Sequence, residues 1–401
     1  DQQKIKLDLI DSNSSSDYNI SFYDVDLASF TNISNTIFFN GRINGNISVT
    51  KNDQTYSGDS NVSITNLKAN NQDLGSAVLK LNASEDSSQI ELDFKINNNQ
   101  KEKLNLFGSF AIEEDYFPLD MILTTQDFNI SPFSKIGKNV INDFEGFFNS
   151  EIIIRGNSLN PVFYGSIQTS NVAFHLPYLN VRYEIDNNST FFLDDQSFFI
   201  DDFTLLNKLT DTKGIISGKI SHNLFKKWFL ELDINTDNLL ILNTKFSDND
   251  LYYGKGMFNG NAIIYGPTDN LLIKLNGSTN KNTSLVIPIN DSKNIGNLKF
   301  LNFVDPSISY DENELKTKSL LVDLDIDFNT NANLEVILDS ESQSKITGVG
   351  NGKLNFKINT LGNFNMFGDY TIERGDISIN HLDGKREIQI TADLKDLDAS
   401  E

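Results

Sequence analysis

Hydrophobic and polar residues alternate one by one along most of the chain. Segments 46–50, 89–96, 321–328 and 353–358 all show this alternation. Successive side chains of a β-strand point to opposite faces, so each segment predicts a strand with one polar and one apolar face. A parallel α/β sheet would instead need continuous apolar runs with regular helices between them. The alternation therefore predicts an all-β fold.

A few segments break the alternation and predict short helices. The clearest is 131–144, where Ser131 is a favourable N-cap residue and Pro132 suits the first helical position. Weaker helices are predicted at 27–36 and 296–304. The apolar residues that follow helical spacing in the first segment are Phe133, Ile136, Val140, Ile141 and Phe144.

A glycine followed by an alternating strand recurs four times along the chain. These glycines are at positions 41, 146, 256 and 350, with spacings of 105, 110 and 94 residues. Repeats of this kind are typical of solenoid-like stacks, in which each unit covers the edge of its neighbour. At about 12–14 residues per strand and corner, the chain would form about 30 strands. No Pro/Ser-rich linker divides it into separate domains.

The chain is strongly acidic, with 33 basic and 55 acidic residues and a formal net charge of −22. Nucleic acids and anionic lipid surfaces attract clusters of Lys and Arg, so the charge argues against nucleic acid as a partner. It favours a solvated outer surface that resists pairing of exposed strand edges. The chain has no cysteine, which excludes disulfides and thiolate metal sites.

The residues that usually carry catalysis or bind metals are sparse. His175, His222 and His381 are far apart, without H-x-x-x-H or H-E-x-x-H spacing, and each is expected on the surface or at a strand edge. There is no Gly-x-Ser-x-Gly nucleophile motif. The sequence therefore predicts no enzyme activity, no metal site and no cofactor.

Three motifs resemble binding sites, but strand structure explains them better. Residues 348–354 resemble a phosphate loop, yet Leu354 stands at the Ser/Thr position and a strand follows, which predicts a β-corner. The alternating aspartates of 323–327 lie on the polar face of a strand, where they do not converge on one calcium ion. The acidic pairs at 194–195 and 201–202 leave weak calcium binding as an alternative.

Several segments that begin and end with glycine have a sequence that is specific to one family. Residues 362–375 read Gly-Asn-Phe-Asn-Met-Phe-Gly-Asp-Tyr-Thr-Ile-Glu-Arg-Gly, and segments 151–165, 172–183 and 253–273 follow the same scheme of strand, glycine and strand. The region from about 131 to 375 resembles the C-terminal part of the TamB family, which is AsmA-like.

The resemblance implies a division of the chain into two parts. Residues 1–130 are expected to form an upstream segment of the same architecture, and residues 131–401 a TamB-like C-terminal domain. After Asp376 the sequence departs from the family pattern, so we expect this domain to be incomplete or gapped there.

The fold and function that the resemblance implies are specific. The fold would be an elongated, strongly curved β-sheet trough with an apolar interior, described as a β-taco or solenoid-like. Such proteins are expected in the periplasm of a Gram-negative envelope, anchored in the inner membrane by an N-terminal segment that precedes this chain. They would carry phospholipid along a hydrophobic groove between the inner and outer membranes, together with a barrel partner of the TamA or BamA type. The alternatives are a factor that assembles outer-membrane proteins through protein contacts, and an adhesin or carbohydrate binder.

The candidate site is the apolar face of the strands. From the alternation alone, an ordinary sandwich core is the favoured interpretation; the resemblance favours a groove that binds phospholipid acyl chains instead. The predicted groove-lining residues are Ile152, Ile154, Phe163, Ile167, Val322, Leu324, Ile326, Phe328, Leu334, Val336, Leu338, Leu354, Phe356 and Ile358.

Overall fold

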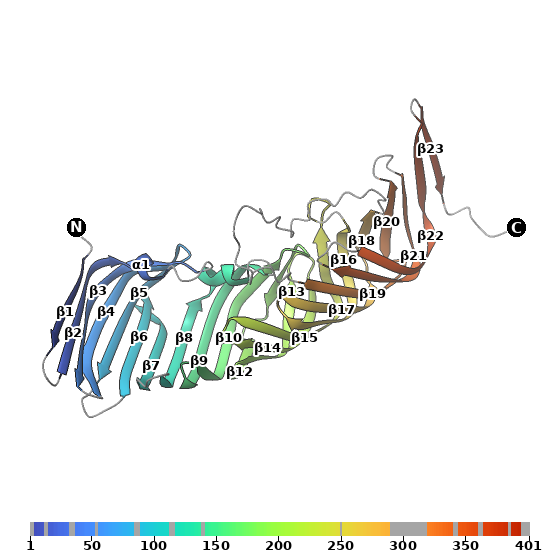
Figure 1. Ribbon diagram of the computed structural model, residues 1–401. Coiled ribbons are helices and arrows are strands. Elements are labelled where there is room, and N and C mark those ends of the chain that lie inside the picture. Colours follow the sequence, from blue (N-terminus) through green and yellow to red (C-terminus); the bar gives the residue numbers. More distant parts are fainter. Residues whose placement is uncertain are drawn as a thin grey trace. The chain divides into compact units, whose positions relative to one another are not determined.

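The chain divides into two compact units. The first comprises the described residues of Asp1–His175, Glu184–Asp201 and His222–Leu224, and the second those of Leu176–Tyr183, Asp202–Ser221 and Phe225–Glu401. The division predicted between residues 130 and 131 stays a prediction. The computed structural model describes residues 4–11, 15–31, 37–52, 55–83, 89–111, 117–137, 141–248, 251–288, 319–339, 344–359, 364–383 and 386–393 (Figure 1).

The elements are almost all strands. The first part of the chain forms β1 (Lys4–Asp11), β2 (Ser15–Asp26), α1 (Ala28–Thr31), β3 (Phe39–Asn52), β4 (Thr55–Ala69), β5 (Gln72–Ala83), β6 (Gln89–Asn98), β7 (Lys101–Ala111), β8 (Pro118–Asn129), η1 (Ser131–Gly137), β9 (Asn142–Asn157) and β10 (Asn160–Leu176). Next come β11 (Val181–Ile185), β12 (Thr190–Asp195), β13 (Ser197–Asn207) and β14 (Thr212–Asn223). The last part forms β15 (Lys227–Thr244), β16 (Tyr253–Pro267), β17 (Asn270–Thr279), β18 (Thr283–Pro288), β19 (Ser319–Phe328), β20 (Ala332–Asp339), β21 (Ser344–Asn359), β22 (Phe364–Asp383) and β23 (Arg386–Asp393).

The predicted all-β class is confirmed, as an extensive curved sheet (Figure 1). The described residues form 23 strands, fewer than the predicted 30. The reason is strand length, because β15 has 18 residues and β22 has 20. Longer strands use more of the chain for hydrogen-bonded ladder and less for corners.

Only part of the predicted helix at 131–144 forms. A 3₁₀ helix, η1, covers Ser131–Gly137, and Phe144 already belongs to β9. The prediction of one continuous helix is wrong because β9 hydrogen-bonds to β8 on one edge and to β10 on the other. The predicted helix at 27–36 is reduced to the four residues of α1, while residues 32–36, Val140 and the segment 296–304 lie outside the described residues.

The first unit follows chain order, because each strand from β1 to β10 pairs antiparallel with the next. Two of its hairpins close through two-residue turns with both central residues at positive φ. Asn70 and Asn71 join β4 to β5, and Asn99 and Gln100 join β6 to β7. Paired positive φ values define type I′ turns, whose twist matches that of the flanking strands.

β-Bulges interrupt several of these strands. Each bulge adds one residue, so the alternation of side chains between the two faces shifts by one position. In β2, Asp24 has φ of 49°, and the register shifts between Phe22 and Val25. The backbone amide of Asp24 donates to Oδ1 of Asn44 at 2.9 Å, and Val25 turns into the core at 4% exposure. An extra residue in the left-handed conformation bends a strand and increases its twist. The same device, with Asp or Asn at positive φ next to a register shift, recurs at Asn66, Asp127 and Asn171.

Two glycines show how closely neighbouring strands approach in the first unit. Gly108 and Gly165 have φ of 154° and 151°. A Cβ on Gly108 would lie 2.2 Å from the carbonyl oxygen of Asp120, and one on Gly165 would lie 2.1 Å from that of Glu151. Only glycine fits such positions, and glycine kinks curve a sheet.

The second unit contains a corner where two ladders meet. The long strand β16 pairs with both β17 and β18, and β21 pairs with both β19 and β20. β17 runs parallel to β19, and β18 runs parallel to β20. At the corner, side chains donate hydrogen bonds to backbone carbonyl groups. Oγ1 of Thr283 donates to the Met257 carbonyl at 3.1 Å, and Nδ2 of Asn329 donates to the Thr279 carbonyl at 2.7 Å.

Candidate functional site

The inner face of the first unit is an apolar surface that continues from strand to strand. Cross-strand partners point to the same face of a sheet, so the register identifies its members. One row consists of Leu79, Phe94, Leu106, Leu123 and Ile152 on β5 to β9. The neighbouring row consists of Leu81, Leu92, Gly108, Met121, Ile154 and Phe163 on β5 to β10.

All four residues predicted in this part of the chain lie on this inner face. Ile154 is directly opposite Phe163, and Ile152 is directly opposite Gly165, two positions before Ile167. Ile152 is 6% exposed, whereas Ile154, Phe163 and Ile167 are half-buried. The face is therefore partly accessible along these strands.

The inner face of the second unit brings together residues that are distant in sequence. Val322, Leu324 and Ile326 of β19 lie directly opposite Ile358, Phe356 and Leu354 of β21, respectively. On the other edge of β19, Leu324 is in register with Leu275 of β17. These six residues thus share one face, together with Phe328, which is opposite Gly352.

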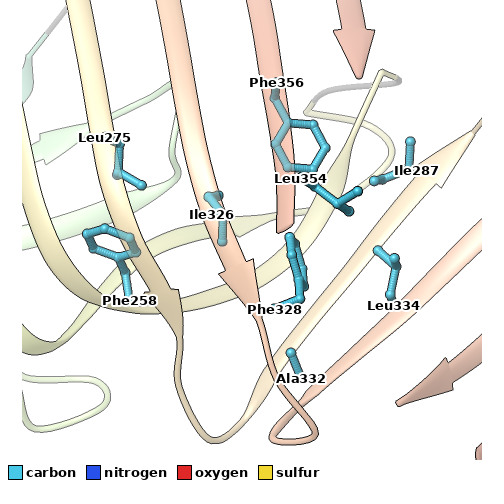
Figure 2. Packing of buried hydrophobic residues seen from close by; sticks show 9 residues of the cluster. All are labelled: Phe258, Leu275, Ile287, Ile326, Phe328, Ala332, Leu334, Leu354 and Phe356. Carbon is cyan, nitrogen blue, oxygen red and sulfur yellow. The ribbon is translucent and has the colours of Figure 1, made fainter. Parts of the chain in front are cut away.

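A packed cluster fills the corner between the two ladders (Figure 2). Five predicted residues belong to it and are 3–9% exposed: Ile326, Phe328, Leu334, Leu354 and Phe356. Burial of this extent makes them a core rather than an open surface. The prediction missed four members of the cluster, although alternation in 258–275 could have pointed to the first two: Phe258, Leu275, Ile287 and Ala332.

The other predicted residues lie around this cluster. Leu324 and Val336 are partly buried against it. Val322 and Ile358 are half-buried further along β19 and β21. Leu338 is 40% exposed and follows the point where the register of β20 and β21 shifts.

The opposite face of β19 and β21 is polar. Asp325 forms an ion pair with Lys353 at 3.1 Å, and Nδ2 of Asn355 donates to Oδ1 of Asp323 at 2.9 Å. The hydrogen bond with Asp325, together with its charge, raises the pKa of Lys353. The glycine run 348–352 lies within β21 at a register shift, which confirms the prediction of a strand corner there.

His222 is buried at 8% exposure, so the prediction of a surface or strand-edge position is wrong for this histidine. Its ring lies between Phe163 and Phe198, with ring centroids 6.1 and 5.5 Å away. Burial lowers the pKa of His222, and the carboxylate of Asp195 partly opposes that effect. His175 is half-buried.

In each of the acidic pairs at 194–195 and 201–202, the second aspartate has a left-handed backbone conformation. Asp195 and Asp202 have φ of 53° and 51°, a conformation that Asp adopts more readily than most residues. No group of three or more acidic or histidine side chains in the described part of the chain could hold a metal ion. Among the same residues, no helix is long and apolar enough to span a membrane.

Comparison with known proteins gives one match. The family described as TamB C-terminal domain matches residues 204–391. This stretch is similar to a TamB C-terminal domain. The match continues through residue 391, and the gap or missing end predicted after Asp376 stays a prediction. No curated protein and no solved structure matches the chain.

The TamB match supports a TamB-like role in the cell envelope. TamB is a transport and assembly module that works with an outer-membrane partner, and it is not known as an enzyme family. The residues of the inner faces offer apolar contact.

Proposed function

We propose that this protein carries phospholipid between the inner and outer membranes, with the acyl chains on the apolar inner faces. The single observation that carries the proposal is the register of the strands. It aligns apolar side chains in unbroken rows, from Leu79 to Ile152 in the first unit and from Leu275 through Leu324 to Phe356 in the second.

Such a face solves the main physical problem of lipid transfer. Each methylene exposed to water costs about 0.8 kcal/mol, so a long acyl chain crosses water very slowly without help. Rows of aliphatic and aromatic side chains remove that cost along their length, while the polar head group stays in water. The step needs neither a cofactor nor a covalent reaction.

Burial divides the predicted groove residues into two roles. The corner residues, such as Phe356 at 3% exposure, hold the fold together. The half-buried residues can contact a lipid without unfolding the sheet. These are Ile154, Phe163, Ile167, Val322, Leu324, Val336 and Ile358.

The setting of this transport is also part of the proposal. We place the protein in the periplasm of a Gram-negative envelope, anchored in the inner membrane by a preceding segment. Its partner would be an outer-membrane barrel protein of the TamA or BamA type. The family match supports this setting.

Native mass spectrometry of the purified chain tests the proposal. We expect co-purified phospholipid, and a severalfold loss of it in an Ile358→Asp variant. The control is Leu321→Asp, because Leu321 is on the opposite face of β19 and already 47% exposed. Chains that are consistently free of lipid would contradict transport and favour the alternative role in assembling outer-membrane proteins.

A further inference from the structure

The outer face of the first unit changes character along one row of cross-strand partners. On β7 to β10 the row is apolar, with Phe107, Ile122, Ile153 and Tyr164 directly opposite one another. A diagonal step continues it to Phe192 on β12, which is opposite Phe199 on β13. On β1 to β6 the same row is polar and consists of Lys6, Ser21, Asn46, Asn61, Lys80 and Asp93.

These six residues, Phe107, Ile122, Ile153, Tyr164, Phe192 and Phe199, form what we call the outer strip. Five of its members are open to solvent, and Ile153 is half-buried: Phe107 is 55% exposed, Ile122 45%, Tyr164 44%, Phe192 54% and Phe199 40%. Single exposed apolar residues are common on protein surfaces, but contiguous ones mark interaction sites.

The sequence of these strands gives an independent sign that the strip is covered. Where the strip crosses them, alternation gives way to apolar runs such as 121–123, 152–154 and 191–193. Continuous apolar runs are typical of strands that are buried on both faces. In these apolar runs, some side chains lie on the inner face, and the others form the outer strip.

Acidic residues surround the strip and indicate the charge of its occupant. Asp93 is in register with Phe107 at one end, and Asp194 is in register with Tyr164 beside the strip. Asp120 and Glu151 lie along its sides. Of the basic residues nearby, Lys95 pairs with Asp93 at 3.3 Å, Arg155 pairs with Asp120 at 3.4 Å, and Lys80 is in register with Asp93. Acidic residues therefore outnumber basic ones beside Tyr164 and Phe192, where Glu151 and Asp194 lie.

We propose that the outer strip is the docking surface for a basic, amphipathic segment of a partner protein. Its apolar stripe would cover the strip, and its Lys or Arg residues would reach the carboxylates beside it, Glu151 and Asp194 first. Six strands spaced by about 4.8 Å make the strip about 24 Å long, which sets the length of the segment. This site is on the face opposite to the proposed lipid path and does not depend on it.

Other occupants fit the strip less well. A second copy of this chain would bring two acidic rims together, at a net charge of −22 per chain. An anionic membrane would be repelled in the same way. Carbohydrate usually stacks on aromatic rings, whereas the middle of the strip is Ile122 and Ile153.

A binding assay with the full chain tests the charge and the apolar contact together. The probe is a fluorescein-labelled peptide of leucine and lysine, about 16 residues long and amphipathic as a helix. We expect the triple variant Phe107→Thr, Ile122→Thr and Tyr164→Thr to weaken its binding at least about tenfold. Threonine suits strands and leaves the net charge unchanged, so loss of binding cannot come from bulk electrostatics.

The matched control is the double variant Leu209→Thr and Phe367→Thr, which removes apolar residues that are 76% and 58% exposed elsewhere. It should bind the peptide as the unaltered chain does, and a glutamate-for-lysine version of the peptide should bind weakly. Circular dichroism should show that both variants are folded. Equal binding by the triple variant and the control would overturn the proposal.

Photo-crosslinking in the producing cell tests the nature of the occupant. A photoreactive residue at Ile122 should capture a protein through a basic amphipathic segment, and one at Asn61, in the polar part of the same row, should not. Lipid, glycan or a homodimer as the main adduct at Ile122 would contradict the proposal.

Discussion

At the scale of single residues, a few backbone positions decide how the sheet bends. Asp24 shows the pattern: its left-handed φ adds a residue to β2, and the amide of that residue is satisfied by Asn44. Gly165 shows another, because its φ of 151° brings β9 so close that a side chain has no room. Both kinds of position explain why a chain rich in Asn, Asp and Gly forms long strands.

Replacement of Gly165 by alanine should destabilise the protein by about 2–4 kcal/mol. The added Cβ would lie 2.1 Å from the Glu151 carbonyl oxygen, so β9 and β10 would have to separate. Urea unfolding followed by circular dichroism measures the change. In Gly214→Ala the nearest atom to the new Cβ would be the end of the Leu239 side chain, at 3.1 Å, with Asn235 O and Thr236 Cβ at 3.4 Å, and stability should change by less than about 1 kcal/mol. Equal effects of the two substitutions would contradict this account of strand curvature.

His222 should make the stability of the protein depend on pH. Burial lowers its pKa in the folded state below the usual 6.5, so the unfolded chain binds the proton more readily. Stability should therefore fall as the pH drops below about 6.5, until the folded-state pKa is reached. Urea midpoints at several pH values should show a smaller loss over this window in His222→Gln. An unchanged pH dependence in that variant would show that His222 is not responsible.

At the scale of elements, alternation predicted the strands well because cross-strand pairing preserves it. Val322, Leu324 and Ile326 were assigned to one face from the sequence, and the register with β21 places them there. Alternation failed where a bulge adds a residue. Asp143 has φ of 49° just before Phe144, next to a register shift in the pairing of β9 with β10.

The corner of the second unit, where the two ladders meet, could not be predicted from the sequence. Its cluster joins Ile287 of β18 with Phe356 of β21, and the two ladders meet only because β16 and β21 each pair with two strands. Nothing in the local pattern of either segment specifies that pairing. For the same reason, alternation did not separate the buried corner residues from the half-buried ones.

Phe356→Ala should cost about 3–5 kcal/mol of stability, the usual range for a buried Phe. The ring packs near Phe328 and Phe364, with centroids 6.3 and 6.0 Å away, so its removal leaves a cavity in the corner. Ile358→Ala, two residues further along β21 and only half-buried, should cost less than half as much. Thermal and urea unfolding would measure both. If the two costs were equal, the corner cluster would not be the core of this unit.

At the scale of the whole molecule, the two faces of the sheet have different roles. Residues on the inner faces are apolar on strand after strand, and we propose that they hold acyl chains. On the outer face of the first unit, the row of cross-strand partners is polar on β1 to β6 and apolar at the outer strip, where we propose a protein contact. Neither role requires catalytic chemistry, which agrees with the scattered histidines and the absence of cysteine.

The most direct test of the central claim is site-specific photo-crosslinking to lipid in the producing cell. The photoreactive residue is placed at Leu106 or Leu324 on the inner faces, and at Phe107 or Leu321 on the opposite faces of the same strands. Mass spectrometry of the adducts should find phospholipid at Leu106 and Leu324 and little at the other two positions. Equal labelling of both faces, or no lipid at Leu106 and Leu324, would contradict a lipid path along the inner faces.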